Sequence, residues 1–355
     1  MNLEPAITQS LPHVLARWHA FDSRTPDVRP LGTGLINDTF IAELPDKSLV
    51  IQRVHPMFSA SVHQDIFAVT EHLARKSMCT PILLPTREGE LCALHQDRLW
   101  RVMTYVPGVA LDKIDSPARA HAGGALVAQW HRALADFDTP MQHVRANKPH
   151  DTAQHLRTLA LALSDHRDHR LYDSVARDAH ALLEAGASLP ALGTLRAHMA
   201  HGDLKLSNLL FDRDSGQGLC LIDLDTMARM PLALELGDAL RSWCNPKGED
   251  VTQATVDTQI LAAALTGYAH QGRAHVDDDE VISIADGLGV IALELAARFY
   301  ADALAERYFG FNSSKFAARG EHNLLRAQGQ WALARDALAR RDELREIATR
   351  AFASG

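Results

Sequence analysis

Two short polar segments limit what this chain of 355 residues can fold into. The first, residues 201–208, reads HGDLKLSN and is followed by the apolar residues LLF. The second, residues 219–226, reads LCLIDLDT and predicts a short buried strand that ends in Asp223 and Asp225. Three roles are open for these two carboxylates: a phosphate-accepting nucleophile with its acid partner, ligands of a metal ion, or the polar end of a strand.

The spacing of three polar side chains suits the transfer of a phosphoryl group from a nucleotide. Asp203 and Asn208 are five positions apart, and Asp223 follows Asn208 by fifteen. In such a reaction one carboxylate accepts or orients the proton of the attacking hydroxyl, while an amide oxygen and a second carboxylate hold magnesium ions. The catalytic loop of protein kinases has the same Asp-x-x-x-x-Asn order, with a metal-binding Asp in the next loop. Here HGD stands in place of HRD, and IDLD in place of DFG.

These motifs resemble the aminoglycoside phosphotransferase/choline kinase superfamily, and within it the N-acetylhexosamine 1-kinase-like branch. Further segments agree in the same order along nearly the whole chain, among them GTGLINDTF, LVIQRVHPMF, LGDALRS, LELAARF and HNLLRAQ. The resemblance implies an α+β, protein-kinase-like fold of two lobes, with ATP and Mg²⁺ as cofactors. It also implies a small-molecule acceptor, for which the anomeric hydroxyl of an N-acetylhexosamine is the first choice.

The pattern of the chain itself predicts the same two lobes. Residues 1–105 combine several strand patterns with one helical pattern at 59–76, whereas residues 106–355 are mainly helical and rich in Ala and Leu. In the second lobe, strand patterns at 209–211 and 219–222 interrupt a series of helices. The helices are predicted at 116–137, 151–164, 172–186, 251–270, 278–305 and 322–352.

Composition and charge exclude other classes of protein. The net charge of −8 gives no electrostatic reason to expect a nucleic acid or an anionic membrane as partner. No apolar run has the length of a membrane span, and the first residues lack the basic start and apolar core of a signal peptide. The four cysteines lie far apart without a C-x-x-C pair, which favours a reducing cytoplasm over a disulfide framework or a zinc site.

The resemblance assigns roles to the residues of the first motif. Asp203 is expected to be the catalytic base and to contact the acceptor hydroxyl. His201 is expected to order the loop through hydrogen bonds. Lys205 either reaches the transferred phosphate or is a solvated lysine. Asn208 and Asp223 are the expected Mg²⁺ ligands, because their oxygens suit a hard ion.

The segment DLDT also resembles the Asp-x-Asp-x-Thr loop of haloacid dehalogenase-type phosphatases, in which the first Asp is phosphorylated. That loop usually opens its catalytic domain, whereas more than two hundred residues precede it here. It would also leave HGDLKLSN without a role. Both aspartates are therefore expected to act near the metal ion and not as a phosphorylated nucleophile with its acid partner. For Asp225 two roles stay open: a metal ligand, directly or through water, and a hydrogen-bonded loop carboxylate.

The first lobe is expected to cover the phosphates of the nucleotide. GTGLINDTF resembles the phosphate-covering turn of the family, and its residues Gly32, Thr33, Gly34 and Asn37 are expected at the phosphates. Glycine permits backbone conformations in which amide N–H groups approach phosphate closely. A G-x-G alone is weak evidence, because it also occurs in ordinary hairpin turns.

The strand SLVIQRV lacks the lysine with which kinases contact ATP. Arg53 is the only cation there and is expected to bind the phosphates, with Asp65 on the next helix as its partner and Glu71 as second choice. The alternative is a surface arginine on an edge strand. At the hinge WRVMTYVPG, the adenine is expected to pair with backbone groups at Thr104 and Val106.

Two residues of the second lobe complete the expected site. Asp238, in LGDALR, resembles the aspartate that braces the catalytic loop in the superfamily. Arg298, in LELAARF, is the first choice for a contact with the sugar. The alternative is an ordinary ion-pair stripe, because Glu294 and Asp302 flank Arg298 at helical spacing.

Two other functions stay open at this point. One is a kinase of the same fold that acts on another alcohol, such as an aminoglycoside, choline or homoserine. The other is a nucleotide-binding pseudokinase, which the missing strand lysine suggests. The presence of Asp203, Asn208 and Asp223 together weighs against the pseudokinase.

Overall fold

The computed structural model describes residues 4–22, 25–32, 36–143 and 150–354, and the chain divides into two compact units. Unit 1 comprises Met1–Gly108, Asp136–Arg145 and Ile222–Asp225. Unit 2 comprises Val109–Ala135, Ala146–Leu221 and Thr226–Gly355. The predicted division into 1–105 and 106–355 did not assign the later segments 136–145 and 222–225 to the first lobe. Residues of these segments form hydrogen bonds with residues of unit 1 that are far away in the sequence, and these bonds are described below.

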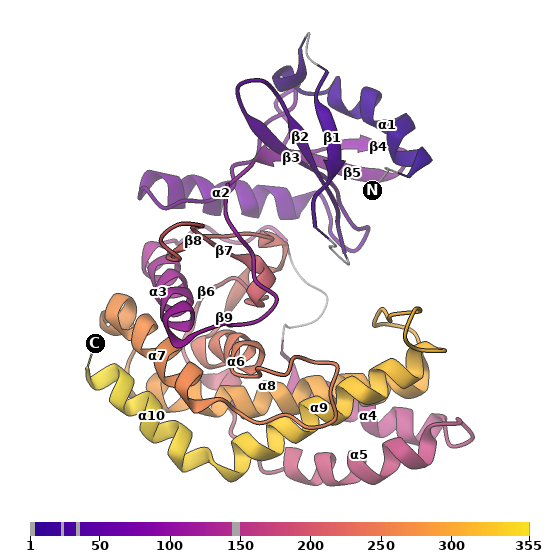
Figure 1. The fold of residues 1–355 in the computed structure, drawn as a ribbon, viewed down its shortest axis with the longest axis vertical. Helices are drawn as coiled ribbons and strands as arrows, with labels where there is room; N and C mark the ends of the chain where they lie inside the picture. Colours follow the sequence, from indigo (N-terminus) through magenta and orange to yellow (C-terminus); the bar gives the residue numbers. More distant parts are fainter. Residues whose placement is uncertain (1–3, 23–24, 33–35, 144–149, 355) are drawn as a thin grey trace. The chain divides into compact units, whose positions relative to one another are not determined.

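Unit 1 is built on an antiparallel sheet of five strands, in the order β1-β2-β3-β5-β4 (Figure 1). The β-branched and aromatic residues of these segments favour strands. In register, Thr39 lies opposite Gln52, which lies opposite Arg101. The strands are β1 (Asp27–Pro30), β2 (Asp38–Glu43), β3 (Ser48–Arg53), β4 (Ala93–His95) and β5 (Arg98–Thr104).

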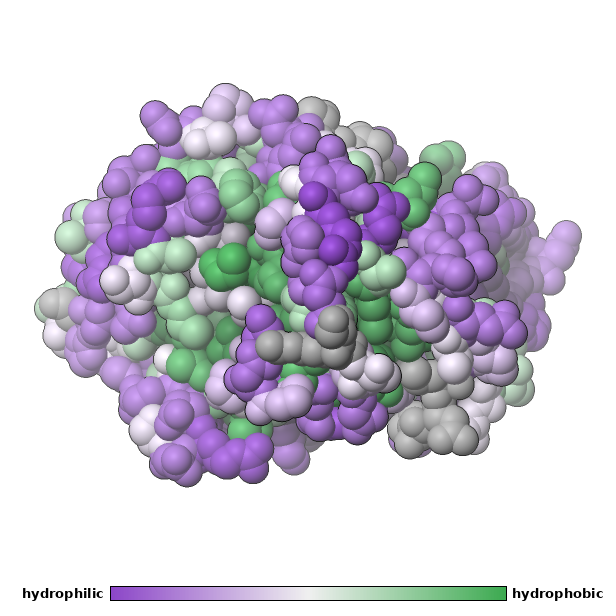
Figure 2. Space-filling view, turned by 90° about the horizontal axis from the view of Figure 1, so that it is seen from above, coloured by the Kyte–Doolittle hydropathy of each residue, from purple (hydrophilic) through white to green (hydrophobic). Residues whose placement is uncertain are grey.

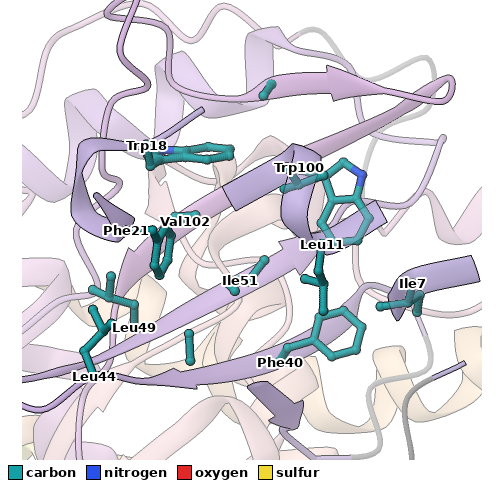
Figure 3. Packing of buried hydrophobic residues seen from close by; sticks show 13 residues of the cluster. Ile7, Leu11, Trp18, Phe21, Phe40, Leu44, Leu49, Ile51, Trp100 and Val102 are labelled. Atoms are coloured by element: carbon teal, nitrogen blue, oxygen red, sulfur yellow. The ribbon is translucent and has the colours of Figure 1, made fainter. Parts of the chain in front are cut away.

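One face of this sheet carries the hydrophobic core of unit 1. Helix α1 (Pro5–Leu15) and the 3₁₀ turn η1 (His19–Phe21) bring Ile7, Leu11 and Phe21 to this face, where they pack with Ile51 and Trp100 of the sheet (Figure 3). Successive side chains of a strand point to opposite faces. The residues that follow Ile51 and Trp100 in sequence, which are Gln52 and Arg101, therefore lie on the face away from this core.

Helix α2 (Ser61–Arg75) also belongs to unit 1 and agrees with the helical pattern predicted at 59–76. Its apolar residues Val62, Ile66, Val69 and Leu73 recur at intervals of four and three, so that one side of the helix is buried.

Unit 2 contains two short antiparallel strand pairs that position the polar motif HGDLKLSN. Strand β6 (Ala197–Ala200) pairs with β9 (Ala228–Pro231), and β7 (Leu209–Phe211) pairs with β8 (Gly218–Leu221). The segment HGDLKLSN connects β6 to β7 and ends in the 3₁₀ turn η3 (Leu206–Asn208). The other 3₁₀ turns are η2 (Leu192–Thr194), η4 (Leu224–Thr226) and η5 (Arg273–His275).

Helices make up most of the rest of unit 2, as its Ala- and Leu-rich sequence favours. Helix α8 packs along α9 and α6, and α3 packs on α7 (Figure 1). The helices are α3 (Pro117–Ala133), α4 (Thr152–Asp165), α5 (Tyr172–Gly186), α6 (Leu232–Trp243), α7 (Thr258–Gly272), α8 (Asp278–Ala305), α9 (Arg319–Ala339) and α10 (Arg341–Ala353).

The predicted α+β class is confirmed, with an antiparallel sheet in the first unit and a mainly helical second unit. Some boundaries were wrong. The helix predicted at 251–270 begins only at Thr258, because the side chain of Asp257 caps it by accepting the backbone N–H groups of Gln259 and Ile260. The pattern at 322–352 forms two helices, α9 and α10, instead of one. Helices α1 and α6 were not predicted.

The surface agrees with the composition. Hydrophilic residues cover much of the face drawn in Figure 2, with smaller hydrophobic areas among them. Within the described parts of the chain, we find no helix with the length and apolar character needed to cross a membrane.

Candidate active site

Candidate site residues occur in both units, and each group is described within its own unit. In unit 2, the loop between β6 and β7 brings Asp203, Lys205 and Asn208 together. Oδ2 of Asp203 accepts hydrogen bonds from Lys205 Nζ at 2.6 Å and from Asn208 Nδ2 at 3.0 Å. Asn208 Nδ2 also donates to the backbone oxygen of Asp203 at 2.8 Å. The carboxylate of Asp203 is thereby oriented, and its second oxygen is the atom left to receive an acceptor hydroxyl.

Glu235, in the first turn of α6, holds the start of this loop. Its Oε1 accepts the backbone N–H of His201 at 2.7 Å, and its Oε2 accepts that of Gly202 at 3.0 Å. Burial alone raises the pKa of Glu235, but His131, whose Nε2 lies 3.6 Å from Oε1, and the bonds to the loop lower it below its ordinary value. An ionised Glu235 therefore fixes two consecutive amide groups of the loop.

The loop backbone has two more supports within unit 2. Thr226 Oγ1 donates to the backbone oxygen of His201, and Trp243 Nε1 donates to that of Leu204, both at 2.9 Å. Gly202 has a φ of +80°, and a Cβ at this position would lie 2.3 Å from the backbone oxygen of Thr226. Only glycine fits there, which explains why HGD replaces HRD in this chain.

These contacts correct one prediction and agree with another. Among the described residues, Glu235 holds the loop from one turn earlier on α6 than the predicted Asp238, which accepts hydrogen bonds from Arg241 Nε and Nη2 at 3.2 and 3.0 Å. His201, which was expected to order the loop, has a fully buried side chain, and its ring lies 6.2 Å from that of Trp130. This buried position suits a supporting residue and not one that contacts a substrate.

In unit 1, the two aspartates of DLDT have different surroundings. Asp225 is buried, and its carboxylate accepts a bidentate pair of hydrogen bonds from Arg101 at 2.5 and 2.7 Å. Asn37 Nδ2 adds a third bond to Asp225 Oδ2 at 2.7 Å. Burial alone raises the pKa of Asp225, but Arg101 and Asn37 hold it below its ordinary value. Of the two roles left open, Asp225 takes that of a hydrogen-bonded loop carboxylate.

Asp223 has a left-handed backbone, with a φ of 65°. This conformation is uncommon for residues other than glycine, although Asp and Asn tolerate it better than most. Such outliers gather at functional sites, where the surrounding structure holds them in place. Asp223 therefore stays the candidate metal ligand of this segment.

Arg101 was not predicted from the sequence as a site residue. Its side chain is almost fully buried in the middle of β5, where Nε donates to Gln52 Oε1 at 2.8 Å. Gln52 Nε2 in turn donates to Thr39 Oγ1 at 3.0 Å, so the polar residues form a row across β2, β3 and β5. The one available signal was an arginine in the middle of a strand whose neighbours in sequence are Trp100 and Val102.

The predicted pair of Arg53 and Asp65 is wrong. Arg53 lies opposite Trp100 in the sheet and so shares the face of the hydrophobic core, where its Nε donates to Asp38 Oδ2 at 2.7 Å. Asp65 is buried and accepts the backbone N–H groups of Gln142 and His143 at 2.6 and 2.8 Å. The alternation of the strand puts Gln52, not Arg53, on the side of Arg101.

The other residues of unit 1 that were expected at the phosphates of the nucleotide lie in different surroundings. Gly32 has the left-handed backbone that a tight turn requires, with a φ of 75°, whereas Thr33 and Gly34 lie outside the described residues. The side chain of Asn37 is used within the protein, because its Oδ1 also accepts the backbone N–H of His55 at 2.9 Å. Both polar atoms of the Asn37 side chain thus bond within the protein, and one of them supports Asp225.

At the expected hinge, the backbone N–H of Thr104 donates to Ile82 O, and Thr104 Oγ1 accepts the N–H of Ile82, both at 2.9 Å. These bonds use the amide that was expected to pair with adenine. The stretch that ends at Val106 remains the candidate for that pairing.

Comparison with known proteins supplies the family. The family profile described as "Phosphotransferase enzyme family" matches residues 27–274, which is more than half of the chain. The chain belongs to this family. It is therefore a small-molecule kinase, and membership implies the use of a nucleotide and a divalent metal ion.

Individual relatives are distant. A homoserine kinase of Cupriavidus metallidurans is 23% identical over 263 residues, which cover 72% of this chain and 76% of that protein. The crystal structure of an aminoglycoside phosphotransferase from Alicyclobacillus acidocaldarius matches with a TM-score of 0.61 and 16% identity, covering 99% of this chain and 98% of that one. An amicoumacin kinase in complex with AMP-PNP, Ca²⁺ and Ami matches with a TM-score of 0.57 and 13% identity, over 91% of this chain and 93% of that one. These structures share the protein-kinase-like fold.

The residues of this phosphotransferase fit a hard divalent cation. The amide nitrogen of Asn208 is used in its bonds to Asp203, which leaves the amide oxygen for a cation. Asp223, the candidate in unit 1, carries its carboxylate on a turn with a left-handed backbone. Within the described ranges, no group of three or more His, Cys, Asp or Glu side chains is arranged to hold a metal ion. A set of few protein oxygens is typical of Mg²⁺, which keeps waters and binds through the phosphates of its nucleotide.

Arg298, in α8 of unit 2, does not form the ion-pair stripe that was the alternative to a substrate contact. Glu294 instead accepts hydrogen bonds from Thr152 Oγ1 at 2.7 Å and from His150 Nδ1 at 3.2 Å. Asp302 accepts backbone N–H groups of the segment that follows α8. The guanidinium of Arg298 lies 5.8 Å from the ring centre of Tyr308 and 5.3 Å from that of Phe309. No acidic partner of Arg298 is found in the part of the chain that the structure describes.

Proposed function

We propose that this phosphotransferase transfers the γ-phosphoryl group of Mg²⁺-bound ATP to a hydroxyl of a small sugar, with the anomeric hydroxyl of an N-acetylhexosamine as the first acceptor to test. The observation that carries the proposal is the Asp203 carboxylate. One of its oxygens is held by Lys205 and Asn208, and the other is available to orient an acceptor hydroxyl. Orientation is what phosphoryl transfer needs most from such a residue.

The chemistry assigns one task to each residue. Asp203 orients the acceptor hydroxyl and takes its proton as the bond to phosphorus forms. An anomeric hydroxyl is more acidic than an ordinary alcohol, so a carboxylate is a sufficient base. Asn208 and Asp223 are the proposed ligands of Mg²⁺, and when bound the ion neutralises charge on the phosphates. Lys205 has a half-exposed ammonium group beside Asp203, which suits a contact with the transferred phosphoryl group.

Arg298 supports a neutral or anionic acceptor. Burial raises the pKa of Asp238, and the charges of Arg241, His150 and Arg298 outweigh this effect and lower it. Arg298 thus lies near Asp238 of α6, one turn beyond Glu235, which holds the catalytic loop. The N–H groups of Arg298 suit sugar hydroxyls, and the rings of Tyr308 and Phe309 offer an apolar surface.

The same arginine favours a second candidate acceptor. An amino alcohol that carries a carboxylate, as homoserine does, would pair with the guanidinium of Arg298 in a bidentate manner. The similarity to a homoserine kinase, at 23% identity, agrees with this candidate without selecting it.

One panel of acceptors decides between these proposals. The full chain is incubated with ATP and Mg²⁺ and with N-acetylhexosamines, free hexoses, homoserine, choline or aminoglycosides, and phosphorus NMR identifies the product. We expect an anomeric sugar phosphate, with Asp203→Asn as the inactive control. Turnover of homoserine in the absence of any sugar turnover would contradict the sugar and support the second candidate. Nucleotide binding without turnover of any acceptor would favour a pseudokinase.

A further inference from the structure

Strand β3 of this phosphotransferase carries no lysine, yet the sheet does carry a buried cation. Gln52 of β3 lies opposite Arg101 of β5, and both side chains point to the face away from the hydrophobic core. Arg101 is about 1% exposed. A buried arginine is costly unless every charge around it is compensated, so its surroundings indicate what it is for.

All three nitrogen groups of the guanidinium have protein acceptors. Nε donates to Gln52 Oε1, while Nη1 and Nη2 donate to the two oxygens of Asp225. Each nitrogen thus has one bond within the protein, and the side chain has almost no exposed surface with which to reach a phosphate. Its effect on a nucleotide has to act through Asp225.

Asp225 controls the turn that contains Asp223. The two residues are separated by Leu224 alone, and η4 begins at that leucine. Asp223 has the left-handed φ of 65°, which a non-glycine residue keeps only where its surroundings enforce it. Arg101 of β5 fixes Asp225 by a bidentate contact, and Asn37, the residue before β2, fixes it by a further hydrogen bond. The turn that contains Asp223 is therefore anchored at Asp225 from two segments of unit 1.

We propose that Arg101 is a positioning residue that replaces the missing strand lysine: it anchors Asp225 and thereby aims the carboxylate of Asp223 at the divalent metal ion. The inference rests on the proposed function, in which Asp223 is a metal ligand. It differs from the usual arrangement in kinases, because the cation comes from β5 and contacts a carboxylate two residues beyond the metal ligand.

The test measures binding without turnover. The affinity of the full chain for the nucleotide analogue AMP-PNP is determined by calorimetry, with Mg²⁺ at several concentrations and with EDTA. Arg101→Lys keeps the charge but loses the bidentate geometry. We expect it to need ~10- to 100-fold more Mg²⁺ for the same effect on nucleotide affinity, which is the usual cost of losing a residue that orients a metal ligand. Its metal-free affinity should stay unchanged.

Two further variants keep the test decisive. Arg53→Lys is the matched control, because Arg53 sits on the neighbouring strand in a similar pair with Asp38 but does not contact Asp225; its Mg²⁺ requirement should equal that of the wild type. Asn37→Ala removes one hydrogen bond from a neutral donor to Asp225, together with the bond to His55 N, and should show the same effect as Arg101→Lys, but weaker, even if Arg101→Lys fails to fold.

The outcomes separate the inference from the proposed function. If the wild type binds AMP-PNP equally with and without Mg²⁺, both the proposed function and the inference fail. If the wild type responds to Mg²⁺ and the Arg101→Lys and Asn37→Ala variants respond identically to it, only the inference fails. An equal loss of affinity with and without Mg²⁺ would also overturn it, because Arg101 would then act on the nucleotide or the fold and not on the metal.

Discussion

Arg101 in unit 1 and Arg298 in unit 2 carry the same charge in opposite surroundings. Arg101 is buried, and its donors are taken up by Gln52 and Asp225. Arg298 is partly exposed, lies over Tyr308 and Phe309, and has no acidic partner among the described residues. A saturated cation holds other residues in place, whereas an unsaturated one is available to a ligand. We interpret the first as a positioning residue and the second as a contact to the acceptor.

Asp203, like Arg298, is available to a ligand, because among the described residues only one of its two carboxylate oxygens accepts side-chain hydrogen bonds. Its substitution should have the largest effect on activity. Asp203→Asn keeps the size of the side chain but cannot accept a proton. We expect kcat to fall by ~10²- to 10⁴-fold, the range for losing general acid–base help, with nucleotide affinity unchanged. Initial rates and calorimetry test this. Asp214→Asn, an exposed change in the β7–β8 turn, is the control, and near wild-type kcat for Asp203→Asn would remove Asp203 from the mechanism.

Substitution of Arg101 and substitution of Arg298 should change the free energy of unfolding by different amounts. Arg101→Met leaves the carboxylate of Asp225 buried and unpaired, which should lower the free energy of unfolding by ~3–5 kcal/mol. Arg298→Met loses no ion pair of the described protein and should change it by ~0.5 kcal/mol or less. Urea titrations of both variants measure the difference. Equal losses would show that the two arginines are not in different situations.

A buried histidine beside Arg101 makes the same region sensitive to pH. Burial, and then the charge of Arg101, lower the pKa of His63 to about 4, while the Ala60 carbonyl and Asp225 act in the opposite direction. Because the unfolded chain binds this proton at a higher pH, stability is full above about pH 6.5 and falls as the pH drops towards about 4.

The size of this effect follows from the difference in pKa. It amounts to ~3.5 kcal/mol at most, since the pKa falls from 6.5 to about 4 and one pKa unit corresponds to about 1.4 kcal/mol. His63→Gln should remove this part of the pH dependence. Urea titrations of the wild type and the variant between pH 4 and pH 7 measure it, and parallel curves for the two proteins would rule out His63 as the source.

The smallest effect is expected for Arg53. Its contact with Asp38 is partly exposed, with side-chain exposures of 20% and 40%, and such pairs contribute ~0–1 kcal/mol. Arg53→Met should therefore lower stability by no more than this and leave kcat unchanged. A large loss of activity in steady-state kinetics would return Arg53 to the phosphate contact that the sequence suggested.

The sequence predicted what is encoded locally. The Asp203–Asn208 motif and the helix patterns of unit 2 depend on neighbouring residues, so their spacing is visible in the chain. The contact of Arg101 with Asp225 joins residues 124 positions apart, and no local pattern announces it. The choice of Arg53 as the cation failed because in a strand one residue changes the face, and Arg53 lies on the face away from Gln52 and Arg101. In a similar way, the support of the loop was assigned to Asp238, whereas Glu235, one turn earlier in the same helix, holds the loop.

The division of roles between Arg101 and Arg298 is tested most directly by steady-state kinetics of Arg101→Lys and Arg298→Lys, with Mg²⁺ and the acceptor varied separately. We expect Arg101→Lys to raise the Mg²⁺ requirement and to leave the KM for the acceptor unchanged. Arg298→Lys should raise the KM for the acceptor by roughly tenfold, the loss of about one charge-assisted hydrogen bond, with the Mg²⁺ requirement unchanged. If both variants alter the same parameter, the two arginines share one role, and the distinction between them is wrong.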